Sequence, residues 1–169
     1  MHLVTSSLLL VAQLNTLSLP AASLLLRLHF LNALALYVSR GRPPLPLADF
    51  YSNTAAAPAP PLATPTPATD ALLPAHTPNP WLPLAQSALA HPDTHLCKTQ
   101  RALMHYADMY GGAAPGCFAE LEELDGAGAL DGTLFVRVAG LTMDRLGWMR
   151  EGGDQGKYDY SGFYAGVRA

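Results

Sequence analysis

Charged side chains are scarce in this sequence, and their scarcity excludes one class of partner. Asp, Glu, Lys and Arg make up 14% of the 169 residues, against about 25% in an average soluble domain. The net charge is −3 and the basic residues form no patch, so we expect no nucleic-acid partner. Half of the residues are hydrophobic, so the chain must cover much apolar surface with itself, another segment or a membrane.

Cysteine is scarce, and the common nucleotide-binding motifs are absent from this sequence. Cys97 and Cys117 could pair once, but they show neither a C-x-x-C motif nor a zinc-ligand spacing. We interpret both as ordinary thiols in a reducing compartment and predict a cytoplasmic protein. No glycine-rich phosphate loop and no G-x-S-x-G motif is present, so the sequence has no fingerprint for a nucleotide or for a serine nucleophile.

Two apolar runs at the N-terminal end lack the length and purity of membrane spans. Polar residues interrupt the run 3–19, and Arg27 lies near the middle of the run 21–38. We therefore predict two buried core helices within residues 1–53 and expect no membrane span. No Lys or Arg precedes Leu3, which disfavours a signal peptide. The alternative is a secreted or membrane-tethered protein with a Pro-rich stalk.

Proline, glycine and apolar spacing set the expected helix boundaries in this part of the chain. Pro20 is expected to break the first helix and Ser23 to cap the second. Gly41, followed by Pro43, is expected to end the second helix. Residues 54–80 consist mainly of Ala, Pro and Thr, and proline denies helices and sheets their hydrogen bonds. We predict a flexible loop or insertion there.

Helical patterns return after residue 80. They predict helices over 81–89, broken early by Pro83, and over 93–110, with Pro92 in the first turn. A short acidic helix is expected over 118–124. The run 130–148 alternates like a strand in one part, but its three- and four-residue apolar spacing favours a helix. Together these patterns predict a mainly α, irregular multi-helix fold in which residues 1–53 and 81–169 form one domain.

A series of residues between positions 91 and 105, all but one of them polar, has a spacing that suits a metal site. His91, His95, Lys98, Ala102 and His105 are four, three, four and three residues apart, which places them on one face of a helix. Neutral imidazoles bind iron or zinc. A lysine becomes a ligand only when its amine is neutral or has captured carbon dioxide as an anionic carbamate. From spacing alone, a solvated polar face is the simpler interpretation.

Four segments in order resemble the questin oxidase-like family. The segments are MHLVTSSLLL at 1–10, LLLRLHFLNALALYVSRGRPPLPLADFY at 24–51, WLPLAQSALAHPDTHLCKTQRAL at 81–103, and LFVRVAGLTMDRLGW with YDYSGFY within 134–164. The resemblance implies a mainly helical fold and an oxygen-dependent ring cleavage of a polyketide-derived aromatic ketone. That step is either a Baeyer–Villiger-type oxygenation with NADPH or a non-haem iron dioxygenation, whose site uses several histidines and a carboxylated lysine.

The resemblance also assigns ligands for Fe(II). The H-x-x-K pair of the family falls on His95 and Lys98, and the histidine of its H-L-V-T-S helix falls on His2. Carboxylated Lys98 would supply an oxygen ligand, and Arg101, one turn further on, could pair with that carbamate. Family members are longer and supply further histidines from their first half, so the resemblance implies a C-terminal portion of a larger helical domain. The alternative is a non-catalytic helical remnant without metal.

Overall fold

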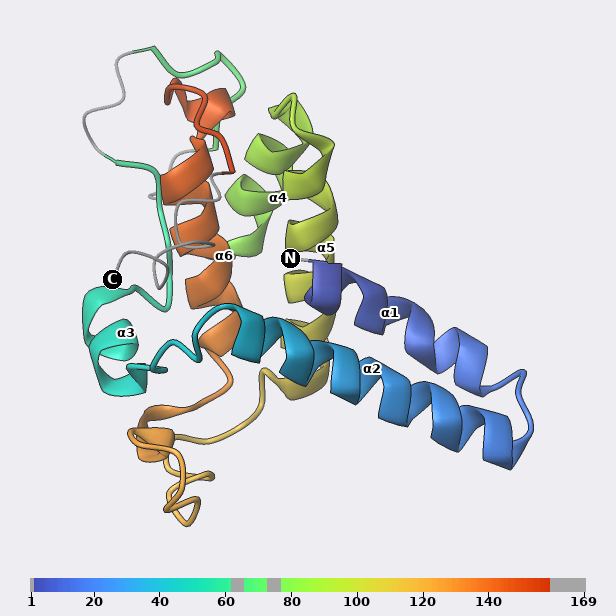
Figure 1. Ribbon diagram of the computed structural model, residues 1–169. Coiled ribbons are helices and arrows are strands. Elements are labelled where there is room, and N and C mark those ends of the chain that lie inside the picture. Colours follow the sequence, from blue (N-terminus) through green and yellow to red (C-terminus); the bar gives the residue numbers. More distant parts are fainter. Residues whose placement is uncertain (1, 62–65, 73–76, 159–169) are drawn as a thin grey trace. The chain divides into compact units, whose positions relative to one another are not determined.

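A computed structural model describes residues 2–61, 66–72 and 77–158. Within these residues the chain forms α-helices and short 3₁₀ helices and no strand (Figure 1), which confirms the predicted mainly α, irregular fold. The chain divides into two compact units, residues 1–44 with 158–169, and residues 45–157. The joining of residues 1–53 and 81–169 into one domain stays a prediction.

The first unit contains a hairpin of two antiparallel helices, α1 (His2–Leu14) and α2 (Leu19–Ser39) (Figure 1). Ser18 is the N-cap position of α2, with an extended backbone at ψ 154°, and Pro20 lies in the first turn. Proline is tolerated there because the first amides of a helix have no intrahelical acceptor. The predicted break at Pro20 and cap at Ser23 are therefore wrong, and Ser23 lies inside α2.

The C-terminal end of α2 confirms the expected stop at Gly41. Gly41 has φ +78°, a conformation that favours glycine, and its amide donates to the Val38 carbonyl at 2.9 Å. The Arg42 amide donates to the Tyr37 carbonyl at 3.1 Å. These two bonds form a Schellman motif, which satisfies carbonyls that the helix itself leaves without donors.

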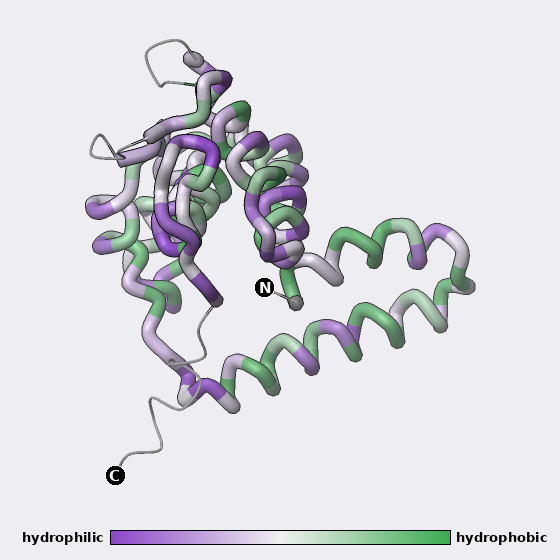
Figure 2. The backbone as a smooth tube through the Cα atoms, turned by 90° about the horizontal axis from the view of Figure 1, so that it is seen from above, coloured by the Kyte–Doolittle hydropathy of each residue, from purple (hydrophilic) through white to green (hydrophobic). Residues whose placement is uncertain are grey.

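Apolar residues run along both helices of the hairpin, as Figure 2 shows. No residue of α2 is buried. By length and composition alone α2 could cross a membrane, but core helices of soluble proteins and signal sequences pass the same test. That these are interior helices of a larger body stays a prediction, and so does the absence of a membrane span.

The second unit is built on three helices, α4 (Trp81–Ala90), α5 (Thr94–Tyr110) and α6 (Leu134–Leu146). Helix α5 packs against both α4 and α6 (Figure 1). Their buried faces repeat at three- and four-residue steps, so the predicted helices over 93–110 and 130–148 are confirmed. The fully buried apolar side chains of this core are Leu84, Leu96, Ala102, Ala139, Met143 and Leu146.

Helix boundaries in this unit correct three expectations. Pro83 lies in the first turn of α4 and does not break the helix. Asp93 is the N-cap of α5, so Pro92 precedes that helix. Residues 118–124 form successive turns rather than an acidic helix, because seven residues rich in like charges gain too little to nucleate one. Further on come the 3₁₀ helices η2 (Ala127–Ala129) and η3 (Met149–Glu151).

The described part of the Ala/Pro-rich region is irregular, and it packs against helices of the second unit, to which it belongs. A further short helix, α3 (Leu47–Asn53), precedes it and was not predicted from the sequence. The Ala68 amide donates to the Arg150 carbonyl at 2.9 Å, and the Arg150 side chain pairs with Asp70 at 2.7 Å. Gly140 allows Pro58 to lie directly against α6, because an added Cβ would overlap with the proline ring.

One carboxyl group is buried in this unit. Glu151, in η3, has 1% of its surface exposed, and neither carboxyl oxygen has a hydrogen-bond partner in the described structure. Burial raises the pKa of Glu151 above its ordinary value of 4.5, and the nearby Ser87 hydroxyl and Arg150 charge offset only part of that rise. The folded state therefore favours the neutral acid.

The stability of the chain should consequently depend on pH through Glu151. Protonated Glu151 makes its full contribution to the free energy of unfolding below pH 4.5, the ordinary pKa of the group. This contribution is lost as the pH rises through the elevated pKa that Glu151 has in the folded state. Over that window Glu151→Gln should gain stability relative to wild type by up to about 1.4 kcal/mol per pH unit. Urea denaturation of both proteins across a pH series measures this difference.

The control for this prediction is Glu122→Gln, which changes an exposed carboxyl. Its stability relative to wild type should stay nearly constant over the same pH range. A Glu151→Gln difference that is equally independent of pH would show that the buried carboxyl has no raised pKa.

Candidate metal centre

Helix α5 carries two of the three predicted ligands. Its N-terminal turn is fixed by Asp93, whose side chain accepts a hydrogen bond from the His95 amide at 2.9 Å. Its inner face is anchored by the Gln100 side chain, which donates to the Ala139 carbonyl of α6 at 3.0 Å. Because one face of α5 is held by the core, the residues on its other faces, His95 and Lys98 among them, have defined positions.

The structure divides the polar series that the sequence placed on one helical face. His91 is not on α5 but at the C-cap of α4, and Ala102 is fully buried against the core. Lys98 and His105 are exposed, and His95 is half-exposed. The expected single stripe is therefore wrong, because the chain turns between His91 and His95. The H-x-x-K pair itself remains on one helix.

His95 is held by a carboxylate. Its Nδ1 lies 2.9 Å from Asp93 Oδ1, the same oxygen that caps the helix. The pKa of Asp93 lies below its ordinary value of 3.8, chiefly because the His95 amide donates to the carboxylate, and the His95 ring adds to this effect. A carboxylate can only accept, so Nδ1 carries the hydrogen. In the neutral ring the lone pair is then on Nε2.

Lys98 lies one helical turn beyond His95, and its side chain is exposed. It makes no hydrogen bond or ion pair within the part of the chain that the structure describes. Arg101 follows one turn further on and is also exposed. Accordingly, both side chains can reach a ligand or a further part of the protein without breaking an existing contact.

His2 is placed differently. It begins α1 in the first unit, whereas His95 and Lys98 belong to the second. The His2 side chain and residues 159–169, which include most of YDYSGFY, lie outside the described structure. The inclusion of His2 in one site with His95 and Lys98 therefore stays a prediction.

The residues that are present fit part of an iron site. Metal-bound histidines commonly donate their second ring nitrogen to a carboxylate, as His95 does to Asp93. Lys98 one turn away would add an oxygen ligand as its carbamate. Among the described residues, no group of three or more His, Cys, Asp or Glu side chains is close enough to hold a metal. The described residues therefore do not bring a complete set of such ligands together.

A second polar cluster joins α3 to α6. The Tyr51 hydroxyl accepts from the Asp131 amide at 3.0 Å, and the Arg137 guanidinium lies 4.8 Å from the centre of the Tyr51 ring. Burial raises the pKa of Tyr51. Burial alone would also raise that of Asp131, but hydrogen bonds from Thr133 bring the pKa of this carboxyl below 3.8. The cluster therefore holds α3 against the start of α6, although the two helices are distant in sequence.

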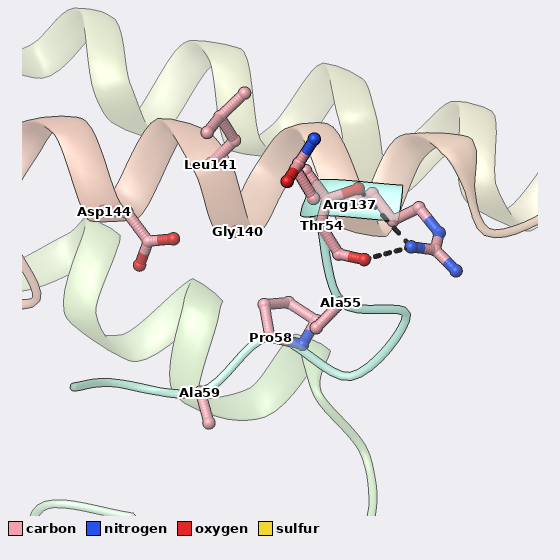
Figure 3. A pocket seen from close by; sticks show the side chains of 9 residues that line it. Thr54, Ala55, Pro58, Ala59, Arg137, Gly140, Leu141 and Asp144 are labelled. Atoms are coloured by element: carbon pink, nitrogen blue, oxygen red, sulfur yellow. Dashed lines mark hydrogen bonds between the residues drawn. The ribbon is translucent and has the colours of Figure 1, made fainter. Parts of the chain in front are cut away.

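A small pocket lies beside this polar cluster (Figure 3). Its volume is about 210 Å³, and it lies between the segment 53–59 and α6. Arg137 donates to the Thr54 carbonyl at one end, and Asp144 lies at the other. Asp144 Oδ1 accepts from the Trp148 indole at 2.8 Å. Because Arg137 and Asp144 already bond to neighbours, the pocket wall is chiefly structural.

Asp93, the residue that holds the His95 ring, was assigned no role from the sequence, although its place two residues before His95 was a readable signal. His91 was predicted as part of the polar series and not as a residue that holds the turn before α5. An N-cap aspartate lies next to the second residue of its helix, so its carboxylate can contact that side chain as well as the amide.

Residues 1–103 match the family model described as Questin oxidase-like. The match covers 103 of 169 residues and includes His2, His95 and Lys98. The resemblance of residues 134–164 lies beyond it and stays a prediction. No curated protein and no solved structure matches this sequence. The family match spans more than half of the chain, and the chain belongs to the questin oxidase-like family.

Proposed function

We propose that this protein is an oxidoreductase that cleaves a ring of a polyketide-derived aromatic ketone with dioxygen, in the cytoplasm. Family membership supports the reaction class and a small-molecule substrate. The observation that carries the proposal is the Asp93–His95 pair, one helical turn from Lys98. This arrangement holds the His95 imidazole one helical turn from the amine that becomes an anionic oxygen ligand when it is carboxylated.

His95, carboxylated Lys98 and His2 would hold Fe(II). Iron, when bound, supplies the redox chemistry with dioxygen that amino-acid side chains lack. The His95 ring contributes a neutral donor whose orientation Asp93 sets. The Lys98 amine, in its neutral form, attacks carbon dioxide, which forms an N–C bond and releases one proton. The resulting carbamate would contribute a negative charge that favours a cation, and Arg101, one turn further on, would pair with it.

A Baeyer–Villiger-type oxygenation with NADPH is the other reaction that the family resemblance suggests. The sequence has no nucleotide-binding fingerprint, so the use of NADPH rests on the family resemblance alone. Oxygen consumption by the iron-loaded protein with an aromatic ketone, with and without NADPH, distinguishes the two reactions.

Iron binding tests the proposal. The full chain, loaded with Fe(II) under anaerobic conditions and then desalted, should retain one iron per chain by elemental analysis. His95→Ala and Lys98→Ala should each weaken binding by about tenfold or more, because each removes a ligand. His105→Ala is the matched control, since His105 is an exposed histidine on the same helix.

Two results would contradict the iron site. The wild type binds no stoichiometric iron, or a His95→Ala, Lys98→Ala double variant binds iron as well as His105→Ala does. Either result would favour the alternative, a non-catalytic helical remnant without metal.

The lysine carbamate can be tested separately. The chain has only two lysines, Lys98 and Lys157, so ¹³C NMR with labelled bicarbonate has few candidate amines. The iron-loaded wild type is paramagnetic, so zinc replaces iron as a diamagnetic probe. We expect one side-chain carbamate signal that disappears in Lys98→Arg and persists in Lys157→Arg. A signal that persists in Lys98→Arg, or no signal at all, would remove the carbamate from the site.

A further inference from the structure

The turn between α4 and α5 is held by an almost fully buried histidine. His91 has 6% of its surface exposed, and its Nε2 lies 2.9 Å from the Leu146 carbonyl oxygen at the end of α6. Its Nδ1 accepts a hydrogen bond from the Asp93 amide at 3.0 Å. A carbonyl oxygen only accepts, so Nε2 carries the hydrogen and Nδ1 the lone pair. Both ring nitrogens of His91 are therefore engaged.

This arrangement fixes the backbone of Asp93. The imidazole of His91 connects the Asp93 amide to the C-terminal end of α6, which is itself part of the buried core. Two hydrogen bonds then hold Asp93. Its amide donates to the His91 ring, and its carboxylate accepts from the His95 amide. Asp93 has little freedom to move away from α5.

The Asp93 carboxylate does more than cap the helix. Asp, Asn and Ser cap helices about equally well through a single acceptor. Here Oδ1 also accepts from the His95 ring at 2.9 Å, and only an aspartate brings a full negative charge to that contact. The charge selects the form of the ring that has its hydrogen on Nδ1.

We propose that Asp93, held in place by His91, is a positioning residue that fixes His95 in the Nδ1–H tautomer and presents Nε2 as its ligand nitrogen. The presentation to a metal rests on the proposed function, but the tautomer does not. A free histidine side chain prefers the opposite tautomer, with the hydrogen on Nε2, so the orientation of His95 requires this carboxylate. His91 acts through Asp93, because its ring accepts the hydrogen bond of the Asp93 amide.

The test compares Asp93→Ser with wild type in the full chain, without metal. Serine keeps the cap bond to the His95 amide but has no charge to hold the ring. Two-dimensional ¹H–¹⁵N spectra of ¹⁵N-histidine protein, with His95→Gln used to assign the signals, report which ring nitrogen carries the hydrogen. We expect Nδ1–H for His95 in wild type and a shift toward Nε2–H in Asp93→Ser. Asp108→Ser, an exposed site on the same helix, should leave His95 unchanged.

Asp93→Asn is the second variant, for use if Asp93→Ser lowers the helical content measured by circular dichroism. Asparagine caps as well as aspartate but lacks its charge, so the same shift toward Nε2–H is expected. If neither folded variant changes the His95 tautomer, or if wild type already has Nε2–H, the positioning role is wrong.

Iron affinity provides the second measurement and separates this inference from the proposed function. Asp93→Ser should bind Fe(II) about 10- to 100-fold more weakly than wild type, the range seen when such partners are removed. A tautomer shift in a protein that never binds iron would support the positioning role and contradict the iron site. Iron binding that is unchanged in Asp93→Ser would support the iron site and contradict the positioning role.

Discussion

The hydrogen bond between the His91 ring and the Leu146 carbonyl is the contact on which the candidate centre depends. It joins the end of α4 to the end of α6 across 55 residues of sequence. The same ring holds the Asp93 amide, so the direction in which α5 leaves the turn is set by the core rather than by local preference. The direction of α5 in turn sets the positions of His95, in the first turn of the helix, and of Lys98, one turn later.

The core of the second unit gives these contacts their rigidity. Helix α5 packs on α4 and α6 through a buried face that is mainly apolar, and the Gln100 side chain on this face bonds to the α6 backbone. Close packing of this kind leaves few alternative positions for the helix. Residues on the exposed side of α5 can therefore be of any type without changing how the three helices pack. Lys98, Arg101 and His105 lie on that exposed side, whereas Leu96 and Ala102 are fully buried on the other.

The sequence predicted the elements that local patterns determine. The apolar spacing of α5 and α6 and the glycine stop at Gly41 depend on neighbouring residues alone. The short helix α3 was missed. The start of α2 and the continuity of α4 through Pro83 were also missed, because a proline near a helix start can either end a helix or begin one. The expected acidic helix at 118–124 failed because like charges outweigh a weak apolar pattern.

Long-range contacts explain what the sequence could not predict about the candidate site. The pairing of Tyr51 with Asp131 spans 80 residues, and that of His91 with Leu146 spans 55, so neither leaves a local pattern. The family resemblance selected His95 and Lys98 where spacing alone favoured a solvated face. The role of Asp93 could have been predicted from the sequence. An N-cap side chain contacts the first residues of its own helix, and His95 is the second residue of α5.

X-ray absorption at the iron edge of the Fe(II)-loaded full chain reports whether His95 is a ligand of a metal bound by this chain. We expect nitrogen and oxygen neighbours with the outer-sphere scattering of imidazole, and a loss of part of that scattering in His95→Ala but not in His105→Ala. Spectra of wild type and His95→Ala that are indistinguishable, with iron bound in both, would show that His95 is not a ligand.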